Sequence, residues 1–187
     1  MENIGDVEFV NATVVAKVTL KAELRVILPH LRFASLAPHF RSLRCFSFNG
    51  SVVTFFSTGR VIVFSKTSSL ARARLKSFIS YLVRLGFVTL ISRSSLSTAK
   101  ISNIFGRLSL PFEKINLEDF RQRLPLAAKA HYDVGSPRAV LRFQILSHKN
   151  DVHVDVFHTG KCTLKAKSKR RILIVADYVL QMLRETI

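Results

Sequence analysis

The arrangement in this sequence that most resembles a catalytic site is a group of titratable side chains in its last third. His153 and Asp155 share one face of the segment DVHVDVF, and His158 follows directly after it. Such a pair can transfer protons or hold a metal ion. However, a third ligand at metal-binding spacing is missing, and polar side chains on an exposed strand face are common. We therefore predict no catalytic residues, no metal site and no cofactor, and we expect that the protein is not an enzyme.

The charge of the chain indicates a polyanionic partner instead. Its 187 residues include 29 lysines and arginines against 12 acidic residues, which gives a formal net charge of +17. Such an excess is typical of proteins that bind nucleic acids, although a ribosomal or merely solvated basic surface would show it too. With 48% hydrophobic residues, the chain can also bury a core.

The cysteines and the N-terminus indicate a reducing compartment. Cys45 and Cys162 both lie in segments predicted as strands, with no zinc-binding spacing. This pattern favours free thiols. The N-terminus MENIGDVEF is not typical of a signal peptide, and no apolar window has the length of a membrane span. We therefore expect a soluble intracellular protein with no membrane partner.

Two motifs occur twice along the chain, which predicts an internal repeat. A Phe-x-Thr-Gly-basic motif contains Gly59 in one copy and Gly160 in the other, 101 positions apart. Upstream, NATVVAKVTL from Asn11 and NIFGRLSLPF from Asn103 are 92 positions apart. The difference predicts an insertion in the second copy, and the Gly- and Pro-containing stretch at residues 132–138 is its natural place.

Each copy follows the same order of elements. An alternating strand comes first, then a short helix, predicted at residues 21–31 and 113–124. Strands follow, with the repeated glycine in the turn between two of them. The strands alternate, with Val53 and Phe55 on one face and Val52, Thr54 and Phe56 on the other. Such alternation predicts a sheet with helices on one face and an open face on the other.

Each copy is predicted to end in a long amphipathic helix. In the first, Ser68 or Ser69 is the expected cap and Gly86 the expected stop. In the second, three basic residues at 169–171 occupy the first turn, where the helix dipole disfavours positive charge. The predicted apolar stripes are Leu75, Phe78, Ile79, Leu82 and Val83 in the first helix and Ile172, Val175, Ala176, Val179, Leu180 and Leu183 in the second.

Several segments, in this order and repeat phase, resemble the core domain of the TATA-box-binding protein family. They are the two Phe-x-Ser/Thr-Gly-Lys/Arg turns, KISNIFG at residues 100–106 and LVRLGF at residues 82–87, and the resemblance covers essentially the whole chain. It implies an α/β (α+β) fold, a two-repeat saddle with a curved antiparallel sheet and helices on the convex face. We expect repeats at residues 1–92 and 93–187, with a linker in SRSSLSTA.

The resemblance also implies a set of DNA-binding residues. In this family, two phenylalanines per repeat wedge between base steps in the minor groove. By position these wedges are Phe56 and Phe157 in the turns and Phe40 in the first repeat. The counterpart of Phe40 falls near Val140, with Leu141 or Phe143 as substitutes if the insertion shifts the register. The remaining expected contacts are Asn11 and Asn103 near the pseudo-dyad, Ile62, Phe64, Thr163 and Lys165 on the concave face, and the turn residues Arg60 and Lys161.

Ordinary structural roles are the alternative to DNA binding for these residues. Phenylalanines in a protein without tryptophan mostly fill the core, and Asn103 can bond its own backbone at a strand end. His153 and Asp155 lie where the family has apolar side chains, which indicates weaker DNA recognition by the second repeat.

The resemblance implies a general transcription factor in the nucleus. It would bind double-stranded promoter DNA as a monomer and assemble with transcription factors of the IIA and IIB type. The loop expected to contact factor IIB, at residues 132–141, has lost most of the family's acidic character. The alternative is a diverged paralogue that serves as a protein-interaction scaffold without TATA-specific bending.

Overall fold

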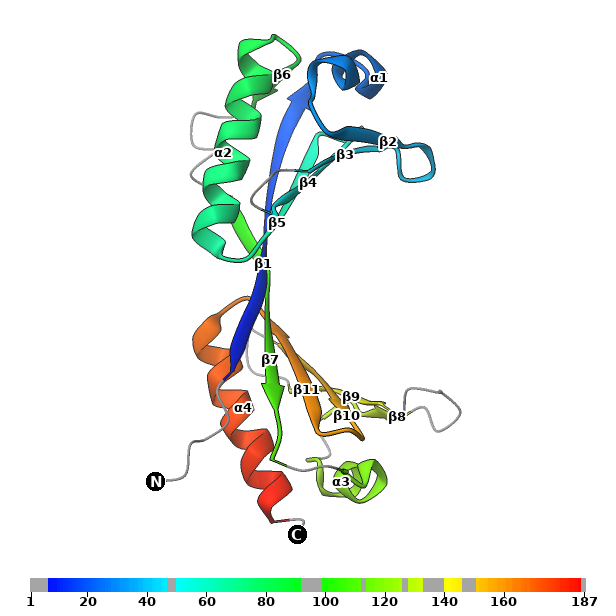
Figure 1. Cartoon of the computed structure of the whole chain (residues 1–187), viewed down its shortest axis with the longest axis vertical. Coiled ribbons are helices and arrows are strands. Elements are labelled where there is room, and N and C mark those ends of the chain that lie inside the picture. Colours follow the sequence, from blue (N-terminus) through cyan, green and yellow to red (C-terminus); the bar gives the residue numbers. More distant parts are fainter. Residues whose placement is uncertain are drawn as a thin grey trace. The chain divides into compact units, whose positions relative to one another are not determined.

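The computed structural model describes residues 7–46, 50–91, 99–111, 114–125, 128–132, 140–145 and 151–185. The chain divides into two compact units, Asn11–Ser102 and Asn103–Ile187, the latter joined by Met1–Val10. We call them the N-terminal and the C-terminal unit. Each contains an antiparallel sheet and one long helix (Figure 1). The predicted linker at residues 92–98 and most of the predicted insertion lie outside the described residues.

The sheet of the N-terminal unit has the strand order β2-β3-β4-β5-β1. A short strand, β6, pairs with the end of β1. The elements are β1 (Glu8–Leu20), α1 (Leu24–Ile27), the 3-10 helix η1 (Leu28–His30), β2 (Ala34–Ala37), the 3-10 helix η2 (Pro38–Phe40), β3 (Ser42–Phe46), β4 (Val52–Phe56), β5 (Arg60–Ser65), α2 (Ser68–Arg84) and β6 (Val88–Leu90).

The C-terminal unit repeats this order, with its strands arranged as β7-β11-β10-β9-β8. The elements are β7 (Lys100–Ser109), α3 (Leu117–Arg123), β8 (His131–Tyr132), β9 (Val140–Ile145), β10 (Val152–Phe157), β11 (Lys161–Ala166) and α4 (Lys169–Arg184). None of the described helices is long and apolar enough to cross a membrane.

The repeated glycines form equivalent turns in the two units. Gly59 and Gly160 have φ angles of 78° and 72°, a left-handed conformation that glycine adopts without a steric cost. The carbonyl of Gly59 accepts a hydrogen bond from the backbone of Val18 at 2.9 Å, and that of Gly160 from Leu110 at 2.7 Å. Both turns are therefore tied to the first strand of their own repeat in the same register.

One long helix covers one face of each sheet. In the N-terminal unit, Leu75, Phe78 and Leu82 of α2 share a buried core with alternate residues of β1, β3, β4 and β5. In the C-terminal unit, Gly106 of β7 lets Ile172 of α4 pack directly on the strand, because a side chain at Gly106 would collide with it. The predicted stripe of α4 is buried throughout, whereas Val83 in the predicted stripe of α2 is 39% exposed.

The helix ends differ from the sequence-based predictions. The hydroxyl of Thr67, rather than Ser68 or Ser69, caps α2 by accepting a hydrogen bond from Leu70 N at 3.2 Å. The first short helix is only α1, since Pro29 continues the chain as a 3-10 turn. The second begins later than residue 113, because Asn116 caps α3 by accepting from the backbone of Glu118 and Asp119.

The two cysteines are free and buried in strands, as predicted. Burial raises the pKa of the Cys45 thiol to about 11 and that of Cys162 to about 12. Both side chains are therefore protonated, inert components of the core near neutral pH.

The turn glycines provide a test of this architecture. Gly59→Ala should lower the free energy of unfolding by more than about 2 kcal/mol, because alanine there meets both the left-handed backbone penalty and the carbonyl of Val18. Gly86→Ala is the matched control, with a φ of 77° and nothing within 4 Å of the added carbon, and should cost about 1 kcal/mol. Urea unfolding of both variants measures the difference, and equal losses would contradict the tight packing of this turn.

Candidate functional site

Each sheet has a second face that its long helix does not cover, and we call it the open face. The open face results from the alternation of side chains along β4, β5, β10 and β11. In these strands, residues that point to the helix side are buried, and the residues next to them in sequence point to the opposite side. The two open faces occupy equivalent positions in the repeats. We describe each one separately below.

The open face of the N-terminal unit is largely apolar. One row crosses β1, β5, β4 and β3 in register and consists of Val15, Ile62, Thr54 and Arg44. The next row places Phe64 opposite Val52 and Val52 opposite Phe46. Phe64 and Phe46 are 40% and 48% exposed, which is unusual for large apolar side chains without a partner surface. No acidic residue lies on this face among the described residues.

Two phenylalanines stand at one end of this face. Phe56 is half-buried at the end of β4, opposite Ser42. Phe40 ends the 3-10 helix η2 and is 74% exposed, the largest exposure among the described large apolar side chains. The next residue, Arg41, has a φ of 44°, so the chain turns in a left-handed conformation directly after Phe40. The wedge candidates Phe40 and Phe56 are thus both accessible, whereas Phe55 is fully buried.

The open face of the C-terminal unit is polar. The row equivalent to Val15, Ile62, Thr54 and Arg44 consists of Arg107, Thr163, Asp155 and Arg142. Nε of Arg142 lies 4.0 Å from Oδ1 of Asp155, and both side chains are well exposed. The acidic Asp155 on this face therefore has a cation beside it.

A second row of this face combines aromatic and polar side chains. It runs through Phe105, Lys165, His153 and Gln144. The ammonium group of Lys165 lies 5.5 Å from the centre of the Phe105 ring, at cation–π distance. Lys165 therefore covers an aromatic ring that would otherwise be the apolar part of this face.

The sheet register corrects the expected counterpart of Phe40. Val140 lies opposite Phe157, as Ser42 lies opposite Phe56, so Val140 is the equivalent of Ser42. Its side chain is only 2% exposed. Counted along the sequence, the position two residues before Val140 is Arg138, which lies outside the described residues.

The two proposed substitutes for that wedge are also part of the core. Leu141 is fully buried and Phe143 is 3% exposed. The ring of Phe143 packs edge-on against Phe120 of α3 with centroids 5.9 Å apart. Neither side chain is available to contact a ligand. Phe157, in contrast, is half-buried at the end of β10 on the open face.

The two asparagines occupy matching places in the first strand of each repeat. Asn11 precedes the pair Ala12–Ser65, and Asn103 precedes the equivalent pair Ile104–Ala166. Both are half-buried. Oδ1 of Asn11 is buried with no hydrogen-bond partner among the described residues.

The basic turn residues Arg60 and Lys161 are exposed. Arg60 lies opposite Lys17, and Lys161 lies opposite Ser109. The sheet register also identifies three cations that the sequence prediction omitted, Arg44, Arg107 and Arg142. Strand alternation is enough to predict that these three side chains lie on the open faces. Which residues of the neighbouring strands lie opposite them is known only from the strand pairing.

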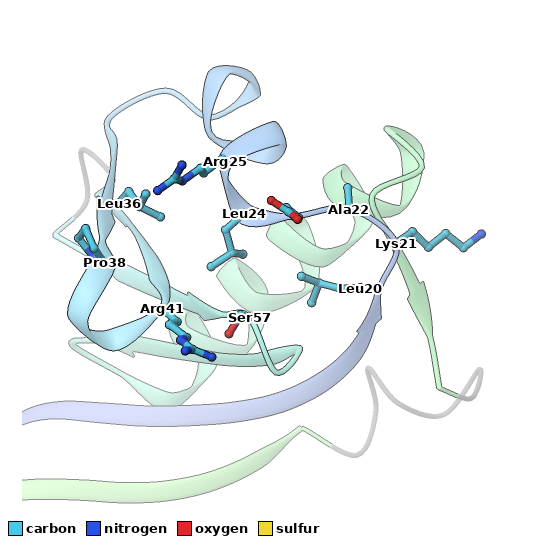
Figure 2. Close-up of a pocket in the computed structure, with 10 residues that line it drawn as sticks. Leu20, Lys21, Ala22, Leu24, Arg25, Leu36, Pro38, Arg41 and Ser57 are labelled. Carbon is cyan, nitrogen blue, oxygen red and sulfur yellow. The ribbon is translucent and has the colours of Figure 1, made fainter.

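A pocket of about 730 Å³ in the N-terminal unit is lined in part by Pro38 and Arg41, which lie on either side of Phe40 in the sequence. Arg25 reaches it from α1 and Arg41 from the turn after η2, while Lys21 points away from it (Figure 2). Leu20, Leu24 and Leu36 form apolar walls. Arg25 and Arg41, which the sequence prediction did not single out, therefore line this pocket together with the acidic Glu23.

The titratable group of β10 does not form a metal centre in the described part of the chain. No cluster of three or more potential metal ligands occurs among those residues. Asp155 faces Arg142 instead, as described above.

Comparisons with known proteins match this architecture. Residues 98–186 match the family model of Transcription factor TFIID (or TATA-binding protein, TBP). These residues belong to the TBP family. The solved structure of Methanococcus jannaschii TBP matches 96% of this chain and 99% of its own, with a TM-score of 0.71 and 22% sequence identity. At that identity the match establishes the fold, and a search of curated proteins found no match.

The predicted resemblance to the TBP family is therefore confirmed for residues 98–186, and the predicted α/β (α+β) fold class is confirmed over nearly the whole chain. The family model matches only the C-terminal repeat, although that repeat has the more polar open face.

Exposure separates two positions that the sequence prediction treated as equivalent. Val140→Ala should lower the free energy of unfolding by about 2 kcal/mol, because it removes buried apolar volume. Phe40→Ala should change it by less than about 0.5 kcal/mol, because the ring is largely in solvent. Chemical denaturation checks both values, and a large loss from Phe40→Ala would mean that the ring is a core residue.

Proposed function

We propose that this TBP-family protein is a general transcription factor that binds promoter DNA in the minor groove and nucleates the assembly of a preinitiation complex. The observation that carries the proposal is the apolar open face of the N-terminal unit, with Phe40 and Phe56 at its end. Its apolar surface, free of acidic residues in the described part, suits the floor of a widened minor groove. TBP-like proteins bind there by inserting apolar wedges between base steps.

The wedge mechanism requires side chains that are accessible and held in place. Phe40 is exposed, and its position is set by the 3-10 helix before it and the left-handed Arg41 after it. Phe56 is held by the pairing of β4 with β3. Inserting such rings unstacks a base step at a cost of a few kcal/mol, which contact with the bent duplex offsets.

The charge of the protein supports binding to the DNA backbone. The exposed Lys17, Arg44 and Arg60 lie on the N-terminal open face, and Arg25 and Arg41 line the pocket that Pro38 also lines. Phosphates of a bent duplex that pass these positions would exchange condensed counterions for arginine and lysine side chains. We therefore attribute most of the affinity to this part of the interface.

The C-terminal unit is proposed to contribute less to sequence selection. It offers one described wedge candidate, Phe157, and its floor consists of Arg107, Thr163, Asp155 and Lys165. The Asp155 carboxylate would repel phosphates, but the nearby Arg142 offsets that charge. Asn11 and Asn103 are proposed to donate to minor-groove acceptors, which read A·T against G·C only coarsely.

The second candidate function is a protein-interaction scaffold without TATA-specific bending. The polar rows of the C-terminal open face favour it, since Lys165 covers Phe105 and Asp155 faces Arg142. In this function the family fold would be kept while TATA-specific bending is lost.

The partners and the location follow from the same proposal. We expect a monomer on double-stranded DNA in the nucleus, with transcription factors of the IIA and IIB type as partners. Most of the loop at residues 132–141, expected to contact factor IIB, lies outside the described residues. The factor IIB contact rests on the resemblance alone.

A gel shift with duplexes of equal length tests the proposed function against the scaffold. A duplex containing a TATA element should bind more tightly than a GC duplex, and raising salt from 50 to 200 mM should weaken binding by about a thousandfold if six phosphates are neutralised. Equal affinity for both duplexes, or binding that salt does not affect, would favour the scaffold.

The wedge asymmetry gives a second test. Phe56→Ala should reduce the DNA bend angle more than Phe157→Ala, because Phe56 acts beside Phe40, whereas Phe157 faces the buried Val140. Fluorescence energy transfer across a short end-labelled duplex measures the bend. Equal losses from the two substitutions would contradict a division of labour between the repeats.

A further inference from the structure

A second pocket of the N-terminal unit lies at the β2–β3 end of the sheet and shares only Phe46 with the open face proposed to contact DNA. It has a volume of about 730 Å³ and is formed by the segment after η1, the end of β3 and one side of α2. Arg74, Ser77, Tyr81 and Arg84 follow one another along α2 at helical spacing, so one side of this helix lines the pocket.

The pocket concentrates positive charge. Arg32, Arg74 and Arg84 line it together with His30, and none of its described lining residues is acidic. Arg84 is held over the ring of Tyr81 at 5.6 Å, and the Tyr81 hydroxyl donates to the backbone carbonyl of His30 at 2.9 Å. Tyr81 therefore contacts Arg84 on α2 and also links α2 to the His30 segment on the other side of the pocket.

The key observation concerns the guanidinium group of Arg74. Its Nε is buried and has no hydrogen-bond partner among the described residues. A buried guanidinium N–H without an acceptor costs free energy, which a bound anion would recover. Because Arg74 also lines the pocket, this donor belongs to a side chain that an anion in the pocket can reach.

No anion within the pocket wall fills this role. The thiol of Cys45 lies beside Arg74. Burial raises the pKa of Cys45 to about 11 and outweighs the opposite effect of the Arg74 guanidinium, so the thiol remains neutral at pH 7. The described wall of the pocket therefore contains no anion that pairs with Arg74.

The remaining wall is apolar and aromatic. Phe33 and Phe46 line the pocket and are 61% and 48% exposed, and Phe78 lies deeper, at 5% exposure. A simple inorganic anion would leave these rings in water. A ligand that combines an anionic head with an apolar body would cover them and also satisfy Arg74.

We propose that this pocket binds a phosphoryl group carried on an apolar, preferably aromatic, body. The phosphoryl oxygens accept from Arg74 and from the arginines at the rim, since guanidinium groups match phosphate geometry. The apolar body lies against Phe33 and Phe46. The carrier is either a soluble phosphate ester or a phosphorylated side chain of a partner protein. Both present the same chemistry to the pocket.

Isothermal titration of the full chain with phenyl phosphate tests the proposal. Arg74→Gln should weaken binding by about tenfold or more, through loss of a charge-assisted contact. Arg72→Gln is the matched control, because it removes the same charge from the same helix on a side that does not line the pocket, and it should bind within about twofold of the unaltered protein. Equal loss in both variants would show general attraction to a basic protein and would overturn the proposal.

Thermal unfolding keeps the test valid if Arg74→Gln affects folding. Without ligand, this variant should melt no lower than the unaltered protein, because it removes an unpaired buried donor. Phenyl phosphate should raise the melting temperature of the unaltered protein and of Arg72→Gln, but not of Arg74→Gln. A ligand-induced increase that persists in Arg74→Gln would place the binding elsewhere.

Further ligands, tested in the same titration, identify the kind of molecule that carries the phosphoryl group. Tighter binding of a short phosphotyrosine peptide than of phenyl phosphate would indicate a protein side chain, and weaker binding would indicate a soluble ester. Inorganic phosphate that binds as well as phenyl phosphate would overturn the role of the aromatic wall. Complete displacement of phenyl phosphate by a DNA duplex, with the same dependence on Arg74, would assign the pocket to the DNA backbone and overturn the proposal.

Discussion

The function of this protein depends on one constraint, the burial of a single helix against a single face of each sheet. Alternate residues of every strand must be apolar to form the core under α2 or α4, and the strand pleat then turns the others to the open face. Those outward positions contribute little to folding, so their chemistry is available for a ligand. The same constraint explains why Val154 and Leu164 are fully buried while Asp155 and Thr163 beside them are accessible.

The two repeats use this freedom differently. The N-terminal unit places Ile62 and Phe64 where the C-terminal unit places Thr163 and Lys165, although both pairs occupy equivalent register positions. The core and turn positions are equivalent in the two units, as the matching hydrogen bonds at Gly59 and Gly160 show. The division is consistent with a protein in which one repeat reads the groove and the other mainly holds the backbone.

The sequence allowed the repeat, the turn glycines and the strand faces to be predicted, because each depends on local spacing. It misassigned Val140, since counting along the chain fails across an insertion and only strand pairing shows that Val140 matches Ser42. The cap at Thr67 was missed because neighbouring serines have a similar propensity. The pocket around Arg74 could not be predicted at all, because its walls come from segments that are far apart in the sequence.

The central claim is that DNA lies against the open face and not against the helices. A photo-crosslinking residue placed at Phe64, on the open face of β5, tests it directly when compared with the same residue at Val83, which is similarly exposed but lies on α2. Each variant is irradiated with a labelled TATA duplex, and the protein–DNA adduct is quantified. We predict an adduct from position 64 and little from position 83. An adduct mainly from position 83 would contradict the account.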